Sequence, residues 1–316
     1  MTTNTVDRVP KSYNSLRYKD ILVSHVPADA PTATKVILVT LNRPQKHNAV
    51  NENILVELES IYNLLDRDER VRAIVLTGAG KSFCSGMDFS GGPQALAAFK
   101  QNQGSAEEWR DPGGRVSMAI SNCVKPTIVA VNGAAAGVGL TSILSAAIRV
   151  AWQGAKISLP FSRRGLTMES CSVFYLPRLI GLSKAMHVVT TGHTYAPFNP
   201  MVEGLFSRVL LTPVETLKYA LELAADVAEN TSLFSTKMMR DMMVHCPDTP
   251  EATHVLDSRV FVEALGSADN IEGMASFIGK RQPEFAGGFD RSAYPFWPWW
   301  KSADQEELIG RVKAKI

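Results

Sequence analysis

The chain has 316 residues, enough for one large domain or two smaller ones. Hydrophobic residues make up 45% and charged residues 20%, which is typical of a soluble globular protein with a sizeable core. The formal net charge of +2 is too close to neutral to indicate binding to nucleic acid or to an anionic membrane. The four cysteines and six histidines lack CxxC, HxxxH and HExxH spacing, so we expect no metal site and no disulfide framework.

Neither end of the chain predicts a membrane or secretory protein. The start, MTTNTVDRVPKSYNS, is too polar for a signal peptide, and no apolar run approaches the ~20 residues of a membrane span. The last three residues, Ala314-Lys315-Ile316, are small, basic and aliphatic, like the tripeptide that addresses proteins to peroxisomes. They predict a peroxisomal location, with the cytoplasm as the alternative.

The first elements in chain order are strands and one helix. Residues 20–26 and 35–44 are β-rich and predict a hairpin. Residues 51–68 carry apolar side chains three and four positions apart, which predicts an amphipathic helix. The apolar run 71–80 ends in glycines and predicts a buried parallel strand. Residues 90–116, rich in Gly, Gln and charge, predict a mobile excursion.

The rest of the chain alternates strands with helices and then becomes almost entirely helical. Residues 125–133 predict a second buried strand, 134–148 a helix of small residues, and 149–160 another strand. The alternation favours a parallel βαβ arrangement, and hence an α/β fold. Further helices are predicted over 170–181, 183–192 and 212–230.

We predict three regions: an α/β core over 18–210, a helical region over 211–286, and an aromatic and proline-rich tail over 287–316. Two interpretations of the tail remain open. It is either a clamp that docks a C-terminal arm on the body or on another subunit, or an aromatic cluster that binds a ligand.

Two glycine-containing turns follow buried strands, GAGKSFCSGMDF at 78–89 and NGAAAGVGL at 132–140. Each brings backbone N–H groups to the carboxyl edge of a strand, where open α/β sheets bind ligands. The second also opens a helix, whose first N–H groups attract negative charge. Two such N–H groups at one point would form an oxyanion hole. The other interpretation is two ordinary structural turns.

Six motifs resemble, in order and spacing, the crotonase (enoyl-CoA hydratase/isomerase) superfamily across residues 18–286. They are LNRPQKHNAV, IVLTGAGKSFCSGMDF, KPTIVAVNGAAAGVGL, ISLPFSRRGL, TTGHTYAP and EGMASFIGKRQPEF. The resemblance implies a spiral of ββα units with a helical C-terminal trimerisation region. It also implies a homotrimer or a hexamer made of two trimers. The substrate would be an acyl-CoA thioester, with no separate cofactor because coenzyme A is part of that substrate.

The resemblance also implies the residues of the site. The oxyanion hole would be the backbone N–H groups of Met87, after Gly86, and of Val138, after Gly137. Many relatives have glycine where Val138 stands, so its side chain narrows or reshapes the pocket. Other residues implied at the substrate or CoA site are Cys84, Ser85, Gly86, Asp88, Gly137, Lys46, Ala49 and Lys280. We expect the Asp88 carboxylate to stabilise its turn rather than to catalyse.

Several basic residues are candidates for binding the CoA phosphates, with a solvated basic face as the alternative for each. They are Arg43, Lys46, His47, Lys280 and Arg281, and Ala49 would lie beside the adenine. Arg163 and Arg164 could each form an ion pair with a phosphate, a substrate carboxylate or an acidic neighbour.

The two glutamates of the family's hydratases are replaced by Thr141 and Phe161. Addition of water needs one group to activate the water and another to deliver a proton, and these two side chains can do neither. The branch of peroxisomal Δ3,Δ2-enoyl-CoA isomerases instead has one carboxylate in a GLxxEGxx stretch. GLTMESCS is similar and places Glu169 there, with Ser170 in place of glycine, and Phe89 in SGMDF also resembles that branch.

We therefore predict an enzyme that shifts the double bond of an enoyl-CoA, with Glu169 as acid/base. An apolar lining of Leu166, Met168, Phe161 and Phe174 should raise the pKa of Glu169. The first alternative is a hydratase-like enzyme of a fatty-acid, polyketide, siderophore or toxin pathway, which a second carboxylate near Glu169 would favour. The second is a CoA-binding relative without catalysis, in which Glu169 is an ordinary acid of a first helical turn. A Glu169 side chain that points to solvent would favour it.

Overall fold

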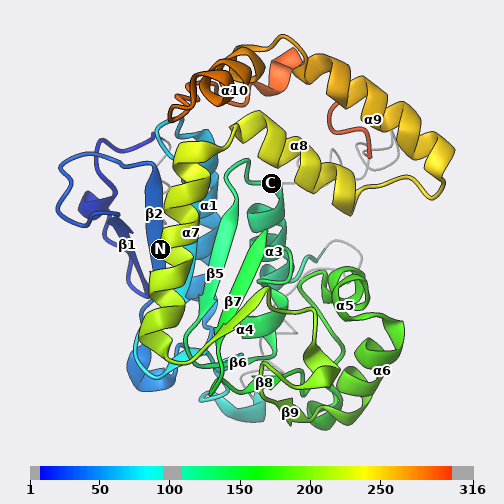
Figure 1. Cartoon of the computed structure of the whole chain (residues 1–316). Helices are drawn as coiled ribbons and strands as arrows, with labels where there is room; N and C mark the ends of the chain where they lie inside the picture. The colour runs from blue at the N-terminus through cyan, green and yellow to red at the C-terminus, as the bar shows by residue number, and fades with distance from the viewer. Residues whose placement is uncertain (1–7, 95–108, 301–316) are drawn as a thin grey trace. The chain divides into compact units, whose positions relative to one another are not determined.

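The computed structural model describes residues 8–94 and 109–300 (Figure 1). Within them, 8–94 with 110–229 form one compact unit, and 109 with 230–300 form a second. The domain boundaries expected at 210 and 286 stay predictions. So does the peroxisomal location, because Ala314-Lys315-Ile316 lies outside the described residues. No helix in the described ranges is both long and apolar enough to span a membrane.

The first unit is built on a six-stranded sheet of order β1-β2-β3-β5-β7-β10. The predicted hairpin is confirmed, since β1 is antiparallel to β2, and all other neighbours are parallel. Every residue of β3 and β5 is buried, as their continuous apolar sequences predict. The strands are β1 (Ile21–His25), β2 (Val36–Leu41), β3 (Ala73–Gly78), β5 (Thr127–Val131), β7 (Ile148–Trp152) and β10 (Arg208–Leu210).

A second, four-stranded sheet has the order β4-β6-β8-β9. The chain passes from β3, β5 and β7 of the large sheet into β4, β6 and β8 of the small one, and each pair of strands is followed by α3, α4 or α5. This repeat is the predicted spiral of ββα units. The new elements are β4 (Ser82–Cys84), β6 (Ala134–Ala136), β8 (Ile157–Ser158), β9 (Thr194–Tyr195), α3 (Pro112–Asn122), α4 (Val138–Thr141) and α5 (Ser172–Ile180).

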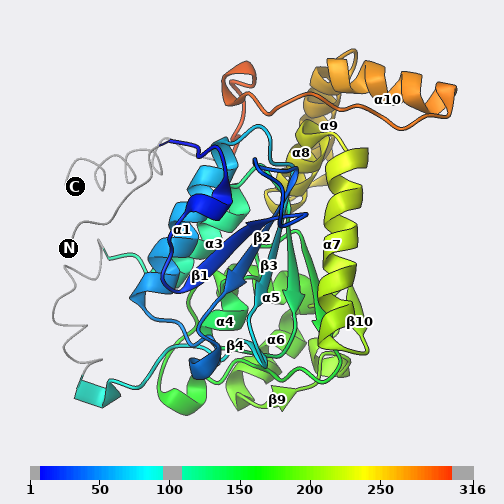
Figure 2. The ribbon, with the colours of Figure 1, turned by 90° about the vertical axis from the view of Figure 1, so that its left-hand side faces the viewer.

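Helices cover both faces of the large sheet. Figure 2 shows α1 (Glu52–Arg67) and α3 on one face and α7 (Pro213–Asn230) on the other. The side chain of Asn51 caps α1 by accepting a hydrogen bond from the Ile54 N–H at 2.9 Å. After α5 the chain forms α6 (Leu182–Thr191) before it returns to β10.

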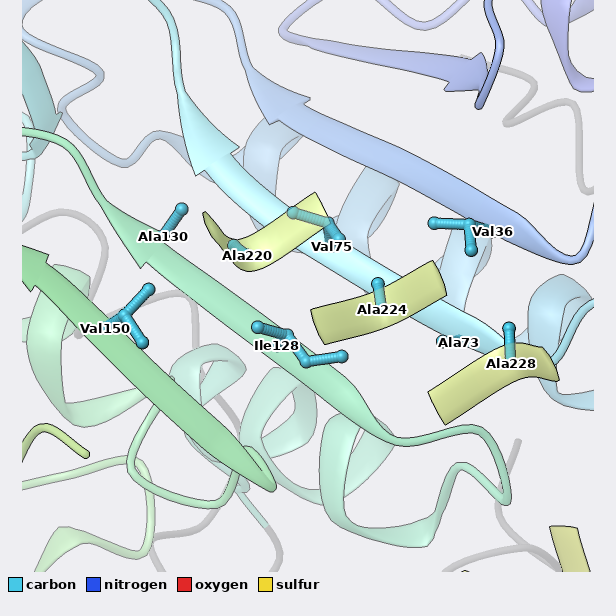
Figure 3. Packing of buried hydrophobic residues seen from close by; sticks show 9 residues of the cluster. All are labelled: Val36, Ala73, Val75, Ile128, Ala130, Val150, Ala220, Ala224 and Ala228. Carbon is cyan, nitrogen blue, oxygen red and sulfur yellow. The ribbon is translucent and has the colours of Figure 1, made fainter. Parts of the chain in front are cut away.

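Alanines spaced four residues apart bring α7 close to the sheet. Ala220, Ala224 and Ala228 are buried against strand residues that include Val75 and Ile128 (Figure 3). Positions i, i+4 and i+8 share one helix face, and the methyl side chains leave room for the strand side chains.

The second unit contains α8 (Leu233–Val244), α9 (Pro250–Ala264) and α10 (Ala268–Gly279). The aromatic segment that follows packs back on α8 and α9. Trp297 donates its indole N–H to the Asp241 carboxylate at 2.7 Å, and the buried Lys237 ammonium donates to the same carboxylate at 2.8 Å. The described part of the segment therefore packs within this unit, while residues 301–316 lie outside the described residues and both interpretations of the tail stay predictions.

Three predictions of local structure were wrong. Residues 149–160 form not one strand but two, β7 in the large sheet and β8 in the small one. Residues 134–148 do not form one helix, because 134–136 pair between β4 and β8 and a left-handed Gly137 (φ 50°) precedes the four-residue α4. The end of the predicted excursion is helical, since α3 begins at Pro112. Its start signal was present in the sequence: Asp111 is the N-cap and a proline takes the first helical position.

Ala224→Leu should destabilise the protein by about 1–3 kcal/mol, because the larger side chain overpacks the interface between α7 and the sheet. Urea unfolding measures the change. The matched control is Ala225→Leu on the exposed side of the same helix, which should change the free energy of unfolding by less than about 0.5 kcal/mol. Equal effects of the two variants would contradict this packing.

Candidate active site

The two glycine turns named in the sequence lie against each other. A Cβ atom added to Gly137 would sit 4.0 Å from the Gly86 Cα, and one added to Gly86 would sit 3.0 Å from the Ala136 carbonyl oxygen. Gly86 has φ 101° and Gly137 φ 50°, conformations that glycine adopts without strain. Met87 and Val138 follow these glycines, and the pairing of their N–H groups in one oxyanion hole stays a prediction. Val138 opens α4, where an N–H has no intrahelical acceptor.

Backbone and ionic contacts fix the first turn. The Val50 N–H donates to the Gly86 carbonyl at 2.7 Å, and the Asp88 N–H donates to the Val50 carbonyl at 2.9 Å. The Asp88 carboxylate accepts from the Ser90 N–H at 3.0 Å and from the Arg43 guanidinium at 2.9 Å. These hydrogen bonds, those from Ser90 first, lower the pKa of Asp88 to about 2. The Asp88 carboxylate therefore stabilises the turn. It also forms an ion pair with Arg43, one of the residues that we considered as ligands of a CoA phosphate.

The loop that carries Lys46 and Ala49 runs beside this turn. The Ser85 N–H donates to the His47 carbonyl at 3.1 Å, which joins the two loops. Lys46 is exposed and Ala49 is buried. A backbone hydrogen bond thus joins the loop of the exposed Lys46 to the turn at Gly86.

Two other arginines considered for phosphate have structural partners. Arg281 forms a bidentate ion pair with Glu272 at 2.6 and 2.7 Å. Arg163 donates to the Thr191 carbonyl at the end of α6 at 2.6 Å. Lys280 is exposed at the end of α10 in the second unit, in a left-handed conformation with φ 49°.

The Cys84 thiol is a packing group. It is buried, and a Cβ atom on Gly139 would come within 2.6 Å of its Cβ, so the absence of a side chain at Gly139 lets α4 approach β4. Burial raises the pKa of Cys84 to about 12. A thiol that holds its proton so strongly is no nucleophile at neutral pH.

The Glu169 carboxyl points into the protein, toward α4. Thr141 donates its hydroxyl to Oε1 at 2.5 Å, and Ser170 donates its hydroxyl to Oε2. A Cβ atom added to Gly113 would collide with Glu169 Oε2 and would lie 3.0 Å from the Val138 Cγ2 atom. The carboxyl and the Val138 side chain are therefore within a few ångströms of each other. Thr141 stands where the family's hydratases have their first glutamate.

A second carboxylate, from Asp111 at the start of α3, lies next to Glu169 and was missed in the sequence. Burial is the largest cause that raises the pKa of Glu169, and the nearby Asp111 carboxylate raises it further. Hydrogen bonds from Ser170 and Thr141 act in the opposite direction. The Asp-Pro pair that caps α3 was the available sequence signal, but the cap alone does not reveal its neighbour in space.

The predicted direction of the pKa shift of Glu169 holds, but the expected apolar lining is only partly present. Leu166 is 51% exposed, and Phe174 stacks under the Arg178 guanidinium at 3.7 Å. Phe161 does reach the site, since its Cζ lies 4.0 Å from a Cβ added to Gly137. The hydrogen bonds to the Glu169 carboxyl come from the hydroxyl groups of Thr141 and Ser170.

Left-handed backbone orients this carboxyl. Ser170 and Cys171 both have φ 57°, which is uncommon for residues with a side chain and costs of order 1–3 kcal/mol each. This explains why related motifs have glycine at the position of Ser170. The conformation lets Ser170 bond to Glu169 through its hydroxyl and to Asp111 through its N–H, at 3.2 Å in the latter case.

No group of three or more metal-ligating side chains occurs among residues 8–94 and 109–300.

Gly113→Ala should destabilise the protein by about 1–3 kcal/mol, because the added methyl group collides with Glu169 and Ser170. The matched control is Gly273→Ala in α10, where the new Cβ would make only ordinary contacts with Phe285 at 3.7 Å. That variant should gain about 0.5–1 kcal/mol, the usual effect of the change in a helix. Chemical unfolding compares the two, and equal stabilisation would contradict the packing of Glu169 on Gly113.

Comparison with known proteins identifies the family of the chain. The family model described as enoyl-CoA hydratase/isomerase matches residues 32–288. A protein of Alternaria alternata named enoyl-CoA hydratase AFT3-1 is 39% identical over 274 residues, which are 87% of this chain and 89% of the relative. The 1,2-epoxyphenylacetyl-CoA isomerase of Escherichia coli (strain K12) is 30% identical, over 80% of this chain and 95% of its own.

Solved structures show the same fold. DspI of Pseudomonas aeruginosa is 26% identical with a TM-score of 0.72, over 86% of this chain and 98% of its own. An enoyl-CoA hydratase of Mycobacterium smegmatis, 24% identical, has a TM-score of 0.71 over 85% of this chain and 100% of its own. With the ββα spiral and the paired glycine turns, these matches establish that the chain belongs to the enoyl-CoA hydratase/isomerase family, the crotonase superfamily.

Proposed function

We propose that the protein shifts the double bond of a 3-enoyl-CoA to give the conjugated 2-enoyl-CoA, with Glu169 as the acid/base. The observation that carries this proposal is the direction of Glu169. Its carboxyl is turned inward beside Val138 and is bonded by Thr141, rather than turned to solvent. A base in that position faces a thioester whose oxygen accepts from the N–H groups of Met87 and Val138.

One carboxylate suffices for the reaction. Glu169 takes a proton from C2, so a C–H bond breaks while an O–H bond forms and negative charge moves to the thioester oxygen. The two N–H groups stabilise that charge, and removal of one such donor costs roughly 3–4 kcal/mol in characterised enzymes. Glu169 then returns the proton to C4, and the double bond is left between C2 and C3. The raised pKa of Glu169 suits a group that must both take and return a proton.

Hydration of a 2-enoyl-CoA is the second candidate. A second carboxylate beside Glu169 is the observation that favours it, since Asp111 and Glu169 could together hold a water. The relative from Alternaria alternata is also named a hydratase. Against this, Thr141 and Phe161 replace the two glutamates that the resemblance identifies in hydratases. A CoA-binding role without catalysis is disfavoured by the inward direction of Glu169.

The ligand and assembly are part of the proposal. We infer that the loop with Lys46 and Ala49 borders the CoA moiety and that Lys280 contributes a cation, without any separate cofactor. We also propose self-association into a trimer or a dimer of trimers. The support is that helices α9 and α10 expose many large apolar side chains, among them Phe277 at 83% and Ile278 at 73%.

Wild-type protein should convert trans-3-hexenoyl-CoA to the conjugated 2-enoyl thioester, followed by its absorbance. Glu169→Gln should lower kcat by at least about 10²–10⁴-fold, because the amide cannot take the C2 proton. The matched control is Glu203→Gln, since Glu203 lies exposed on the same unit and pairs with Lys184. It should retain full activity.

The same protein is tested with trans-2-hexenoyl-CoA in water. Hydration of this substrate without isomerisation of the other would overturn the leading proposal in favour of the second candidate. Retention of isomerase activity in Glu169→Gln would overturn the assignment of the base.

A further inference from the structure

Asp111 does more than begin a helix. As the N-cap of α3, its Oδ1 atom accepts from the Gly114 N–H at 2.5 Å, an ordinary capping bond. The same oxygen also accepts from the Ser170 N–H at 3.2 Å, 59 residues away in sequence. One carboxylate oxygen thus joins the start of α3 to the loop that presents Glu169.

The contacts around Glu169 converge on the same point. Ser170 contacts both acids. Its N–H donates to Asp111, and its hydroxyl donates to Glu169 Oε2. The Asp111 carboxylate also lies close enough to Glu169 for its charge to raise the pKa of Glu169. Gly113, two residues after Asp111, leaves the space that the Glu169 carboxyl fills.

The titratable groups that act on Glu169 come from α3 and from its own loop. Asp111 is the acidic one, and Cys171 is the neighbouring thiol, whose pKa burial and then the charge of Asp111 raise. Thr141, from α4, is a neutral hydroxyl on the opposite side. No basic side chain is among the principal influences on Glu169 within the described part of the chain.

On its other side Asp111 borders solvent. A cavity of about 340 Å³ is lined by Asp111, Cys171, Arg110, Arg115 and Glu59, among others. Glu59 pairs with Arg115 at 3.5 Å. Glu59 is therefore a second carboxylate in the same cavity. It pairs with Arg115 and does not act on Glu169.

We propose that Asp111 is a positioning residue for Glu169, holding the catalytic carboxyl toward Thr141 and Val138 and strengthening it as a base by accepting its hydrogen bond when it is protonated. This inference rests on the proposed function of Glu169. Asp111 is joined to the loop of Glu169 through the Ser170 N–H, so in this proposal it acts only through the base.

Asp111 takes part in neither proton transfer of the reaction. Glu169 gains the proton lost from C2 and gives it back at C4, while Asp111 neither gains nor loses one. The negative charge of Asp111 favours the protonated form of Glu169, and so makes removal of the weakly acidic C2 proton more favourable. The same charge raises the pKa of Glu169 in the free enzyme, which the pH dependence of kcat/KM reports.

The test is Asp111→Asn, with Asp111→Ser as the second variant. Both side chains keep an oxygen that caps α3, so the fold should survive, but both lose the charge. We expect the acid limb of the kcat/KM profile to move to lower pH by at least about half a unit, because the pKa of Glu169 falls. We also expect kcat on the plateau to fall by about 10-fold with KM nearly unchanged.

Glu59→Gln is the matched control, because it removes the other carboxylate of the cavity. Its pH profile should superimpose on that of wild type. Profiles of both Asp111 variants that superimpose on wild type would overturn the proposal and leave Asp111 as a helix cap. A variant that fails to fold is replaced in the comparison by the other, and loss of folding in both would assign Asp111 a purely structural role.

Different results would overturn the proposed function and the proposed role of Asp111. If wild type converts neither hexenoyl-CoA, the proposed function fails, and the effect of Asp111 is still measured by infrared titration of carboxyl groups. The band that disappears in Glu169→Gln belongs to Glu169. Its titration should move to lower pH in Asp111→Asn, and an unmoved band would overturn the inference.

Discussion

The arrangement of the site depends on one packing constraint: the Glu169 carboxyl occupies space that exists because residue 113 has no side chain. Around that space, α3 supplies Asp111, α4 supplies Thr141, and the loop after β8 supplies Ser170. Each of these elements belongs to a different ββα unit of the spiral. The fold therefore brings together groups from three repeats at a point that no single repeat could build.

This position has an energetic cost that a purely structural acid would not require. The carboxyl is partly removed from water, it lies beside another carboxylate, and two residues after it adopt left-handed backbone. Burial and like charge both disfavour the ionised form, and left-handed backbone costs free energy wherever a side chain is present. Such features cluster at functional sites, where the strain is tolerated because it orients a reacting group. An acid at an ordinary first helical turn would instead be exposed and unstrained.

The sequence predicts much of the fold because its signals are local. Buried strands such as β3 appear as continuous apolar runs, and α1 shows its period and its cap. The prediction of one helix over residues 134–148 was wrong for a physical reason. A run of small buried residues has no hydrophobic periodicity that would distinguish a strand from a helix. The family motifs place Glu169 and the two glycine turns. They do not reveal Asp111, because its neighbour is 58 residues away and only the spiral brings the two together.

The most direct test of the account is proton exchange on hexanoyl-CoA in D2O, followed by 1H NMR. This saturated thioester can be neither isomerised nor hydrated, so the measurement isolates the removal of a proton from C2 beside the oxyanion hole. The account predicts that wild type replaces C2 protons with deuterium and that Glu169→Gln, while still binding the thioester, does not. Absence of exchange in wild type that binds hexanoyl-CoA, or equal exchange in the variant, would contradict the role of Glu169.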